Sequence, residues 1–350
     1  MVRKTALIVG ATGVVGRALL DFLVPMPDWD VLALSRRKPH VAQGTRHVDM
    51  DLLDAADCRA KAHSLRDVTH VFFAAYVDRA DTSAWVNDNT RMFVNLVDAV
   101  EGAASNLQHV HVVEGTKWYG GHLGPFKTPA KETDTRHMPP NFYFNQQDFV
   151  EARQRGKPWT WSASRPHTIC GFSLSSPMNL PLTIAVYTAI CKELSLPLFF
   201  PGNAGNYRIL YQACEATHLA RALTWMASTP ACANEAFNIT NGDLIRWENV
   251  WPKFAKYFGM EADAPRAWKL TQLMADKQPV WERIVAKHGL KPYRLDQLAS
   301  WAFADYVFTP NYDIVSDVSK LRRYGFHELV DTEAMFLRLF DQFRHERAVP

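Results

Sequence analysis

The sequence predicts an α/β protein with a doubly wound parallel sheet and a smaller, mainly helical C-terminal region. Three observations indicate this class. A strand-like run, a glycine-rich turn and an amphipathic helix follow one another within residues 5–23. Strand-like and helix-like segments then alternate as far as residue 165, which is typical of a parallel sheet with helices on both faces. Beyond residue 170 the alternation fades, and helical stretches rich in aromatic residues replace it.

The N-terminal segment carries the clearest local signal. Ala6–Val9 is an apolar run typical of a buried parallel strand, and apolar residues recur with helical spacing over 14–23. Glycines stand at every third position of the turn between them, at Gly10, Gly13 and Gly16. They suit, in that order, a tight turn, the close approach of a pyrophosphate and close packing of helix on strand. Because the unpaired amides of a helix N-terminus attract phosphate, we expect a dinucleotide to bind here, as in a Rossmann fold.

The exit of the second strand indicates which dinucleotide binds. Asp30–Lys38 reads as this strand and its exit. A site for NAD places an acidic residue there to bind ribose hydroxyls, whereas a 2′-phosphate needs cations. This chain has Ser35, Arg36 and Arg37 at that point, and its nearest acidic residues lie at the entrance of the strand. Charge-assisted hydrogen bonds from Arg36 would favour the phosphate, so we expect NADPH. The alternative is that these arginines are only solvated.

The following segments continue the alternation. Val48–Leu53 reads as a third strand that runs into an acidic turn, where Asp51 or Asp54 could also cap a helix. The other elements expected in this part are strands at His70–Tyr76, Gln108–Val113 and Trp159–Arg165, with helices over 83–104 and 145–155. We therefore expect residues 1–170 to form the nucleotide-binding domain, with a later return of the chain at about 205–245. Residues 171–350 are expected to form a mainly helical substrate-binding region.

Composition narrows the classes of function. The 350 residues are 47% hydrophobic and 21% charged with a formal net charge of +3, an ordinary balance for a globular protein. No block of lysine and arginine is long enough to predict nucleic-acid binding. No apolar run reaches membrane-spanning length, and the N-terminus shows no signal-peptide pattern. We expect a cytoplasmic protein that binds neither nucleic acid nor membranes.

Metal and disulfide chemistry have little support in the sequence. The five cysteines are odd in number and form no Cys-x-x-Cys pair, as expected for small core residues in a reducing compartment. The histidines do not repeat at metal-ligand spacing, and His109 and His111 most simply flank the fifth strand. No metal is therefore expected. The oligomeric state stays open, a homodimer included.

Candidate catalytic residues follow the fifth strand. The spacing Gly-x-x-Gly-x-x-Gly resembles that of short-chain dehydrogenases/reductases, but no tyrosine has a lysine four residues later, so their usual Tyr-x-x-x-Lys pair is absent. After the fifth strand the chain reads Glu114-Gly-Thr-Lys-Trp-Tyr-Gly120. Either the protein only senses a nucleotide or another pair does the chemistry. Lys117 lies at the carboxyl end of this strand, where open α/β sheets bind ligands. Tyr143 lies in Asn141–Asp148, just ahead of the next predicted helix, and could reach the same crevice.

These motifs resemble one family closely. The matching segments are Gly115–Tyr119, Gly124–Phe126, Asn141–Asp148, Trp161–Pro166, Ile169–Ser173, Asn234–Asp243 and Pro279–Glu282. In this order, and over nearly the whole chain, they are similar to the progesterone 5β-reductase/iridoid synthase-like (PRISE) family. Members are atypical extended short-chain dehydrogenases/reductases. One departure is Phe144, where the family often has a second tyrosine, and segment lengths differ after Gly120 and around Thr309–Ile314.

The resemblance implies site residues and an activity. It places the catalytic pair on Tyr143 and Lys117 and puts Phe126 near the substrate; the alternative for Phe126 is an ordinary core position. It implies cofactor contacts at Thr12, Gly13, Val14, Val15, Ser35, Arg36, Arg37, Asp51, Leu52, Ala75, Tyr76, Val113, Lys117, Tyr143, Ile169, Ser176, Pro177 and Met178. The implied activity is NADPH-dependent ene-reduction, in which hydride adds to the C=C bond of an α,β-unsaturated carbonyl, such as a steroid or terpenoid enone.

Charge flow explains why these residue types suit this reaction. Negative charge develops on the carbonyl oxygen, and a phenol such as Tyr143 aimed at that oxygen stabilises the enolate. Lys117 would make the local potential more positive. The proton for the α-carbon could come from solvent or from Tyr143. Two alternatives stay open: a carbonyl reductase or sugar-nucleotide epimerase of the extended type, and a non-catalytic NADP-sensing regulator.

Overall fold

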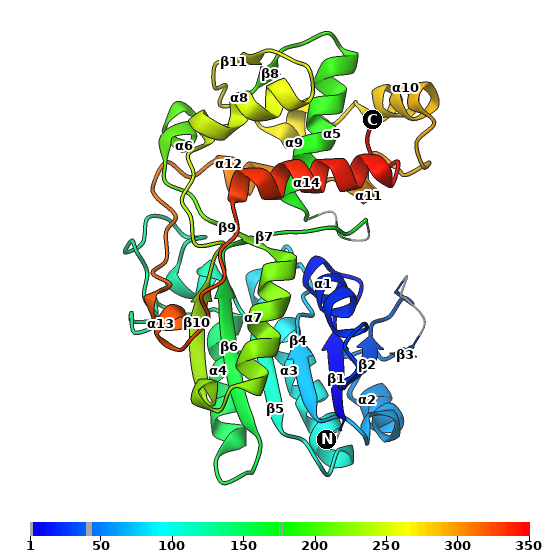
Figure 1. Cartoon of the computed structure of the whole chain (residues 1–350), viewed down its shortest axis with the longest axis vertical. Coiled ribbons are helices and arrows are strands. Elements are labelled where there is room, and N and C mark those ends of the chain that lie inside the picture. Colours follow the sequence, from blue (N-terminus) through cyan, green and yellow to red (C-terminus); the bar gives the residue numbers. More distant parts are fainter. Residues whose placement is uncertain (1–2, 40–43, 175, 177) are drawn as a thin grey trace.

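A seven-stranded sheet forms the lower half of the molecule, and helices form the upper half (Figure 1). The computed structural model describes residues 3–39, 44–174, 176 and 178–350. The sheet runs in the order β10-β6-β5-β4-β1-β2-β3, and all of its pairings are parallel. Its strands are β1 (Lys4–Val9), β2 (Trp29–Leu34), β3 (Thr45–Val48), β4 (His70–Phe73), β5 (His109–Val113), β6 (Thr160–Pro166) and β10 (Glu235–Ile239). The predicted doubly wound α/β class is confirmed.

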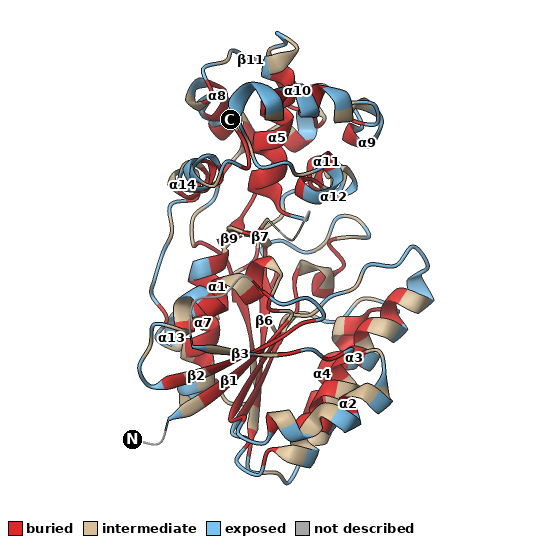
Figure 2. Cartoon of the chain, turned by 90° about the vertical axis from the view of Figure 1, so that its right-hand side faces the viewer, coloured by how far each residue is buried: buried red, intermediate tan, exposed pale blue. Residues whose placement is uncertain are grey.

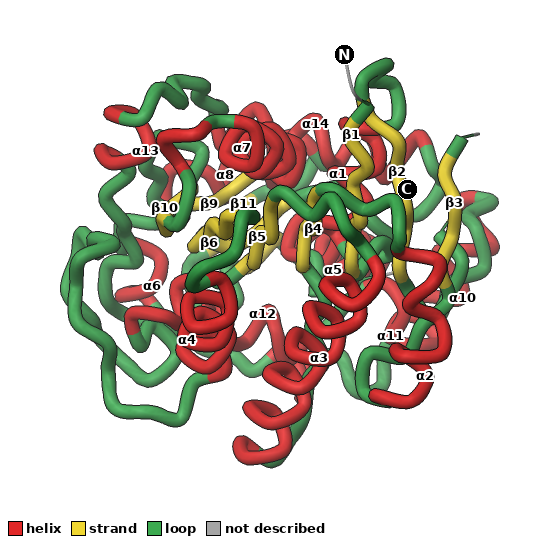
Figure 3. The backbone as a smooth tube through the Cα atoms, turned by 90° about the horizontal axis from the view of Figure 1, so that it is seen from below, coloured by secondary structure: helices red, strands yellow, loops and turns green. Residues whose placement is uncertain are grey.

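Helices cover both faces of the sheet (Figure 3). One face carries α1 (Val14–Leu23) and α7 (Ala216–Ser228), which pack on a core that includes Ile8 and Phe237. The other carries α2 (Ala55–Lys61), the 3-10 turn η1 (Ala62–Leu65), α3 (Thr82–Ala103) and α4 (Phe142–Gln154) over a core that includes Val71 and Val110. Because both faces are buried, β1, β2 and β4 consist mainly of apolar residues.

The C-terminal region has its own core around helix α5 (Leu180–Glu193), most of which is buried (Figure 2). A helix that is apolar on nearly every side is stable only at the centre of a packed unit. Trp247, Trp251 and Trp281 are fully buried beside it. The surrounding elements are α6 (Ala204–Arg208), α8 (Trp247–Tyr257), α9 (Leu270–Leu273), α10 (Gln278–His288), α11 (Leu295–Leu298), α12 (Trp301–Phe308), α14 (Thr332–His345), β8 (Leu198–Phe199) and β11 (Ala262–Asp263).

The chain crosses between the two halves more than once. After α5 and α6, strand β9 (Ala213–Glu215) pairs with β7 (Thr168–Cys170), and α7, the 3-10 turn η3 (Pro230–Cys232) and β10 return to the sheet. Helix α13 (Ser319–Arg323) then lies against β10 before α14 rejoins the upper half. The assignment of the halves to cofactor and substrate stays a prediction.

Three predicted boundaries are wrong. The strand predicted at His70–Tyr76 ends at Phe73, because Phe73 pairs with Val9, the last residue of β1, and residues 74–76 already belong to the loop that lines the cleft. The third strand ends at Val48 instead of continuing to Leu53, since Val48 pairs with Leu34, the last residue of β2. The acidic turn therefore lies wholly in a loop, and Asp54 caps α2 by accepting from the amides of residues 56 and 57. Helix α4 begins at Phe142, before the predicted start at 145, because the Asn141 side chain accepts from the Tyr143 amide and caps the helix.

Membrane-spanning helices, metal-ligand clusters and cysteines can each be compared with what the composition predicted. In the part of the chain that the structure describes, no helix combines the length and the apolarity needed to cross a bilayer. No group of three or more metal-ligating side chains gathers within the described ranges. All five cysteines are buried and carry free thiols.

A ladder of polar side chains runs along β5 and β6 inside the sheet. His109 bonds through its two ring nitrogens to Thr160 Oγ1 and Ser162 Oγ, both at 2.8 Å. His111 bonds in the same way to Ser162 Oγ at 2.7 Å and Ser164 Oγ at 2.9 Å. Burial lowers the pKa of His109 well below its ordinary value and the pKa of His111 to about 3. We call these five residues the polar ladder; its histidines are neutral in the folded protein.

The buried histidines make stability depend on pH. A histidine of the unfolded chain has a pKa of about 6.5. Below this pH the unfolded chain therefore binds protons that the histidines of the folded ladder do not bind. The contribution of the neutral histidines to the free energy of unfolding is therefore complete above about pH 6.5 and decreases as the pH drops toward 3. We expect a loss of about 2 kcal/mol per ladder histidine between pH 7 and pH 5, measured by urea unfolding. His111→Gln, which keeps a donor and an acceptor, should reduce this slope; an equal slope in both proteins would contradict the assignment.

Candidate active site

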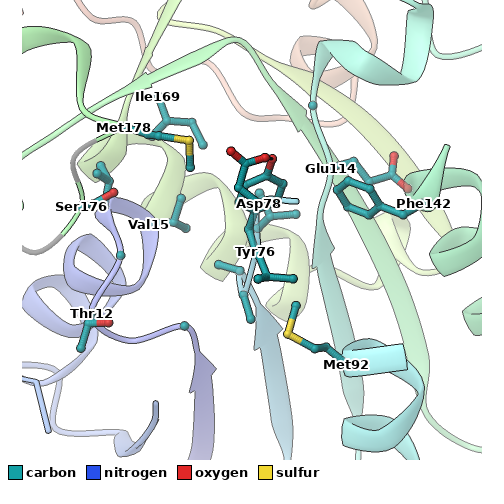
Figure 4. A pocket seen from close by; sticks show the side chains of 18 of the residues that line it. Thr12, Val15, Tyr76, Asp78, Met92, Glu114, Phe142, Ile169, Ser176 and Met178 are labelled. Atoms are coloured by element: carbon teal, nitrogen blue, oxygen red, sulfur yellow. Dashed lines mark hydrogen bonds between the residues drawn. The ribbon is translucent and has the colours of Figure 1, made fainter. Parts of the chain in front are cut away.

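A cleft of about 650 Å³ opens at the carboxyl ends of the sheet strands and is lined from both halves of the molecule (Figure 4). In Figure 4, Thr12 and Val15 lie on one side of it and Phe142 on the other, with Tyr76 and Asp78 between them. Helix α12 contributes Phe303 and Tyr306 from the opposite half. This is the position at which open α/β sheets bind ligands.

The glycine turn has the geometry expected of a phosphate loop. Gly10 has φ +84°, and a Cβ there would lie 2.9 Å from the Ala74 carbonyl oxygen, so only glycine fits. Helix α1 starts after Gly13 without a side-chain cap, which leaves its first amides available to a ligand. Gly16 does not line the cleft: a Cβ there would lie 2.3 Å from the Gly10 carbonyl oxygen, so its role is helix–strand packing.

The basic loop after β2 also borders the cleft. Ser35, Arg36 and Arg37 line it, and both arginine side chains are exposed. The Ser35 hydroxyl donates to the Arg37 carbonyl at 2.6 Å and shapes this loop. Neither guanidinium forms an ion pair or hydrogen bond with the described residues, so both are free to bind an anion. Asp51 and Leu52 lie on the same side, and Asn95 donates to the Leu52 carbonyl at 2.8 Å.

The other predicted site residues, for cofactor and substrate, divide into three groups. Those that line the cleft are Thr12, Gly13, Val14, Val15, Ala75, Tyr76, Val113, Lys117, Tyr143, Ile169, Ser176 and Met178. Pro177 lies outside the described residues. Phe126 does not line this cleft; it packs with Trp118, Tyr119 and Phe144 in a neighbouring aromatic cluster. A contact between Phe126 and substrate stays a prediction.

Lys117 projects from a short turn after β5, η2 (Thr116–Tyr119). Its Nζ lies 4.7 Å from the ring centre of Trp85 and 5.7 Å from that of Tyr76. The Lys117 ammonium makes no hydrogen bond or ion pair with any described residue. Burial lowers the pKa of Lys117, and the charge of Asp78 partly opposes this. The site therefore contains a partly buried amine close to two aromatic rings.

Tyr143 stands in the first turn of α4, and its ring centre lies 4.3 Å from that of Phe142. Burial raises the pKa of Tyr143, and Tyr76, Glu114 and Tyr306 raise it further. Its hydroxyl therefore stays protonated at neutral pH and can donate a hydrogen bond. A Cβ on Gly115 would lie 3.4 Å from that hydroxyl, so the small residue at 115 leaves space in front of it.

Asn141 connects the two candidate catalytic segments. Its Oδ1 accepts from the Tyr143 amide at 3.0 Å, and its Nδ2 donates to the Lys117 carbonyl at 2.8 Å. The side chain is fully buried. The single side-chain amide of Asn141 thus caps α4 and holds η2, and this fixes the position of the Lys117 backbone relative to that of Tyr143.

A buried ion pair lies beside the cleft, where Glu114 lines it. Arg165 Nε donates to Glu114 Oε2 at 2.9 Å, and both side chains are almost wholly buried. The guanidinium also donates to Tyr119 and Gln147 and stacks on Trp118 at 3.6 Å. Burial, more than the opposing attraction of Arg165, raises the pKa of Glu114 to about 7. This arginine has its partners inside the fold and is not available to a ligand.

The sequence prediction missed several residues of the cleft. Asp78, Glu114, Phe142, Phe303 and Tyr306 line it, and Trp85 lies behind Lys117. Asn89, to which no role was assigned, is fully buried and bonds both backbone groups of Val77. It thereby holds the loop that carries Tyr76 and Asp78. Of these structural roles, the sequence could have indicated that of Asn141, since asparagine is a preferred residue at a helix start.

The sheet order, the glycine turn and the cleft together have the form of an extended short-chain dehydrogenase/reductase. Solved structures agree with this class. A UDP-glucose 4-epimerase of Thermotoga maritima matches with a TM-score of 0.69 and 14% identity, covering 97% of this chain and 99% of that one. RMD from Pseudomonas aeruginosa complexed with NADPH matches with a TM-score of 0.67 and 13% identity, covering 96% and 98%. At such identities the likeness concerns the fold alone.

The family follows from sequence comparison. The family model described as a PRISE-like Rossmann-fold domain matches residues 43–350. An (S)-8-oxocitronellyl enol synthase of Camptotheca acuminata is 34% identical over 99% of this chain and 94% of its own length. A 3-oxo-Δ(4,5)-steroid 5β-reductase of Arabidopsis thaliana is 34% identical (99% and 93%), and a short chain dehydrogenase of Penicillium aethiopicum 31% (99% and 99%). The chain belongs to the PRISE-like Rossmann-fold family, as the sequence motifs predicted.

The double role of Asn141 can be tested by Asn141→Asp. Aspartate still caps α4 but has no N–H group for the Lys117 carbonyl, which it repels. We expect a loss of about 1–3 kcal/mol in the free energy of unfolding, measured in urea. The matched control is Asp331→Asn, since Asp331 caps α14 and only accepts, from the amide of Ala334. This change should cost about 0.5 kcal/mol or less; equal losses would contradict the second role of Asn141.

Proposed function

We propose that this protein is an NADPH-dependent ene-reductase that reduces the C=C bond of α,β-unsaturated carbonyl compounds. The observation that carries the proposal is the placement of Tyr143 and Lys117. They come from separate segments, line one cleft at the carboxyl edge of the sheet, and are tied together by Asn141. Family relatives support the activity, since one is named as a 3-oxo-Δ(4,5)-steroid 5β-reductase.

Several features support NADPH as the cofactor. The uncapped start of α1 beside the glycine turn suits a pyrophosphate. Arg36 and Arg37 line the same cleft, and their guanidinium groups have no partner among the described residues, which suits a 2′-phosphate. When bound, the reduced nicotinamide supplies the hydride. Residues of the loops after β4 and β5, including Ala75 and Val113, would then border it.

Tyr143 is proposed to stabilise the enolate. Its hydroxyl is protonated at neutral pH and has no hydrogen-bond partner among the described residues. It can therefore donate to the substrate carbonyl oxygen, and that bond strengthens as negative charge grows on the oxygen. Lys117 adds a positive charge within the same cleft, which favours this charge development. The proton for the α-carbon is proposed to come from solvent.

The walls of the cleft indicate the type of enone. Phe142, Phe303 and Tyr306 present aromatic surface next to the polar groups. Such a wall suits an apolar ring or chain whose single carbonyl reaches Tyr143. We therefore propose cyclic or terpenoid enones as substrates.

Tyr143→Phe should lower kcat for enone reduction by about 100-fold or more, because the donor to the developing oxyanion is lost. NADPH affinity, measured by cofactor fluorescence, should stay close to that of the parent protein. Turnover is followed by the loss of NADPH absorbance with a cyclic enone, and the product should be the saturated ketone. An allylic alcohol would instead indicate carbonyl reduction.

The control for this variant is Tyr187→Phe. Tyr187 is a buried tyrosine whose hydroxyl donates to the Phe199 carbonyl, in the C-terminal core and away from the cleft. Removal of the Tyr187 hydroxyl should leave kcat for the enone nearly unchanged. Wild-type turnover by the Tyr143→Phe protein would contradict the proposed role of the phenol.

The double variant Arg36→Ala, Arg37→Ala tests the cofactor. Each guanidinium is proposed to form charge-assisted hydrogen bonds with the 2′-phosphate, which NADH lacks. We expect the Kd for NADPH to rise about 10- to 100-fold and the Kd for NADH to change little, both measured by calorimetry. An equal change for both dinucleotides would show that these arginines do not read the phosphate.

A further inference from the structure

Within the described residues, no carboxylate lies at ion-pair distance from the Lys117 ammonium. Asp78 influences it electrostatically, but lies beyond ion-pair distance and accepts from the Tyr76 hydroxyl and the Arg79 amide. His122 is another titratable group that interacts with Lys117; burial, Lys117 and His137 lower the pKa of His122 to about 4, so it is neutral at physiological pH. Since a buried ammonium without partners is costly, some other interaction must favour its charge.

The faces of two aromatic rings provide that interaction. The Lys117 Nζ is 4.7 Å from the ring centre of Trp85 and 5.7 Å from that of Tyr76, both within cation–π range. The rings are joined to each other, since Trp85 Nε1 donates to the Tyr76 hydroxyl at 3.1 Å. The Tyr76 hydroxyl in turn donates to Asp78 at 3.1 Å. We call Trp85 and Tyr76 the aromatic cage.

Packing holds the indole of Trp85 in this position. Only 8% of Trp85 is exposed, although it lies in the first turn of α3. Its ring meets that of Phe142 edge-on, with centres 4.7 Å apart and planes at 88°. The ring centres of Phe142 and Tyr143 lie 4.3 Å apart. The cage is thus continuous with the packing that positions Tyr143.

We propose that Trp85 is a positioning residue for Lys117: its indole face, fixed by Tyr76 and Phe142, holds the ammonium charged and oriented in the cleft in place of a carboxylate. This deepens the proposed function and rests on it for the catalytic use of Lys117. A carboxylate partner would cancel the positive charge that the developing enolate needs, whereas a neutral ring stabilises the ammonium and leaves its charge in the site.

Fluorinated tryptophans at position 85 provide the sharpest test. Adding fluorine atoms to the indole changes its size little but removes negative charge from its face, which weakens the cation–π interaction stepwise. The pKa of Lys117 is measured by NMR in protein labelled with carbon-13 at the lysine Cε atoms, and Lys117→Arg assigns the signal. We expect an upfield ring-current shift of this signal in the parent protein. Its pKa should fall stepwise with fluorination, by about half a pH unit or more in total.

Trp281 is the matched control. It is fully buried, its Nε1 donates to the Tyr293 carbonyl, and no cation lies over its ring among the described residues. The same fluorination series at 281 should leave the Lys117 titration unchanged. A Lys117 signal without a ring-current shift in the parent protein would overturn the inference, and so would a pKa that stays constant along the series at 85. The ring-current shift is measured on the parent protein, and Lys117→Arg is needed only to assign its signal.

The pH dependence of enone turnover separates this inference from the proposed function. Fluorination at 85 should move the alkaline limb of kcat to lower pH, together with the NMR titration. If the NMR changes occur while no enone is reduced, the reductase assignment fails and the cage is upheld. If enones are reduced normally and the NMR series is flat, the reductase assignment stands and the cage is refuted.

Discussion

The site depends on the register of the parallel strands. Val9 pairs with Phe73, Phe73 with Val112, and Val113 with Ser164, so the central strands end at one level. The glycine turn, the loop with Tyr76 and Asp78, and the turn with Lys117 therefore open at the same edge. Because both faces of the sheet are covered by helices, this edge is where backbone and polar side chains can meet a ligand. Helix α12 then closes the cleft from the other half.

The parts that could be predicted have short-range signals. The glycine spacing predicted the turn after β1, and the apolar runs predicted most strands, because their burial on both faces leaves a mark on the sequence itself. Arg36 and Arg37 were identified because the end of β2 is easily recognised. Lys117 and Tyr143 became candidates from their places, after β5 and just ahead of a predicted helix, but their pairing as catalytic residues depended on the resemblance to a family, since no local spacing relates Tyr143 to a lysine 26 positions earlier.

The residues that were missed owe their roles to tertiary packing. Trp85 has the spacing of any core residue of α3, and only the folded chain shows the ammonium over its ring. Arg165 and Glu114 are 51 positions apart, and their pairing depends on the neighbouring positions of β5 and β6. The misplaced end of β3 has a similar cause: strand length is set by the partner, here β2, and not by the apolarity of the segment that follows.

The polar ladder has a consequence for how the chain finds its alignment. An apolar pattern penalises a slip of one residue between strands, which turns every side chain to the opposite face, but it tolerates a slip of two. In β5 and β6 a slip of two would leave imidazole nitrogens or hydroxyls facing hydrocarbon without partners, since Ser162 is shared by both histidines. The histidines thus specify the register of β5 against β6, because only the native alignment pairs all of their ring nitrogens, whereas valines alone would pack equally well after a slip of two.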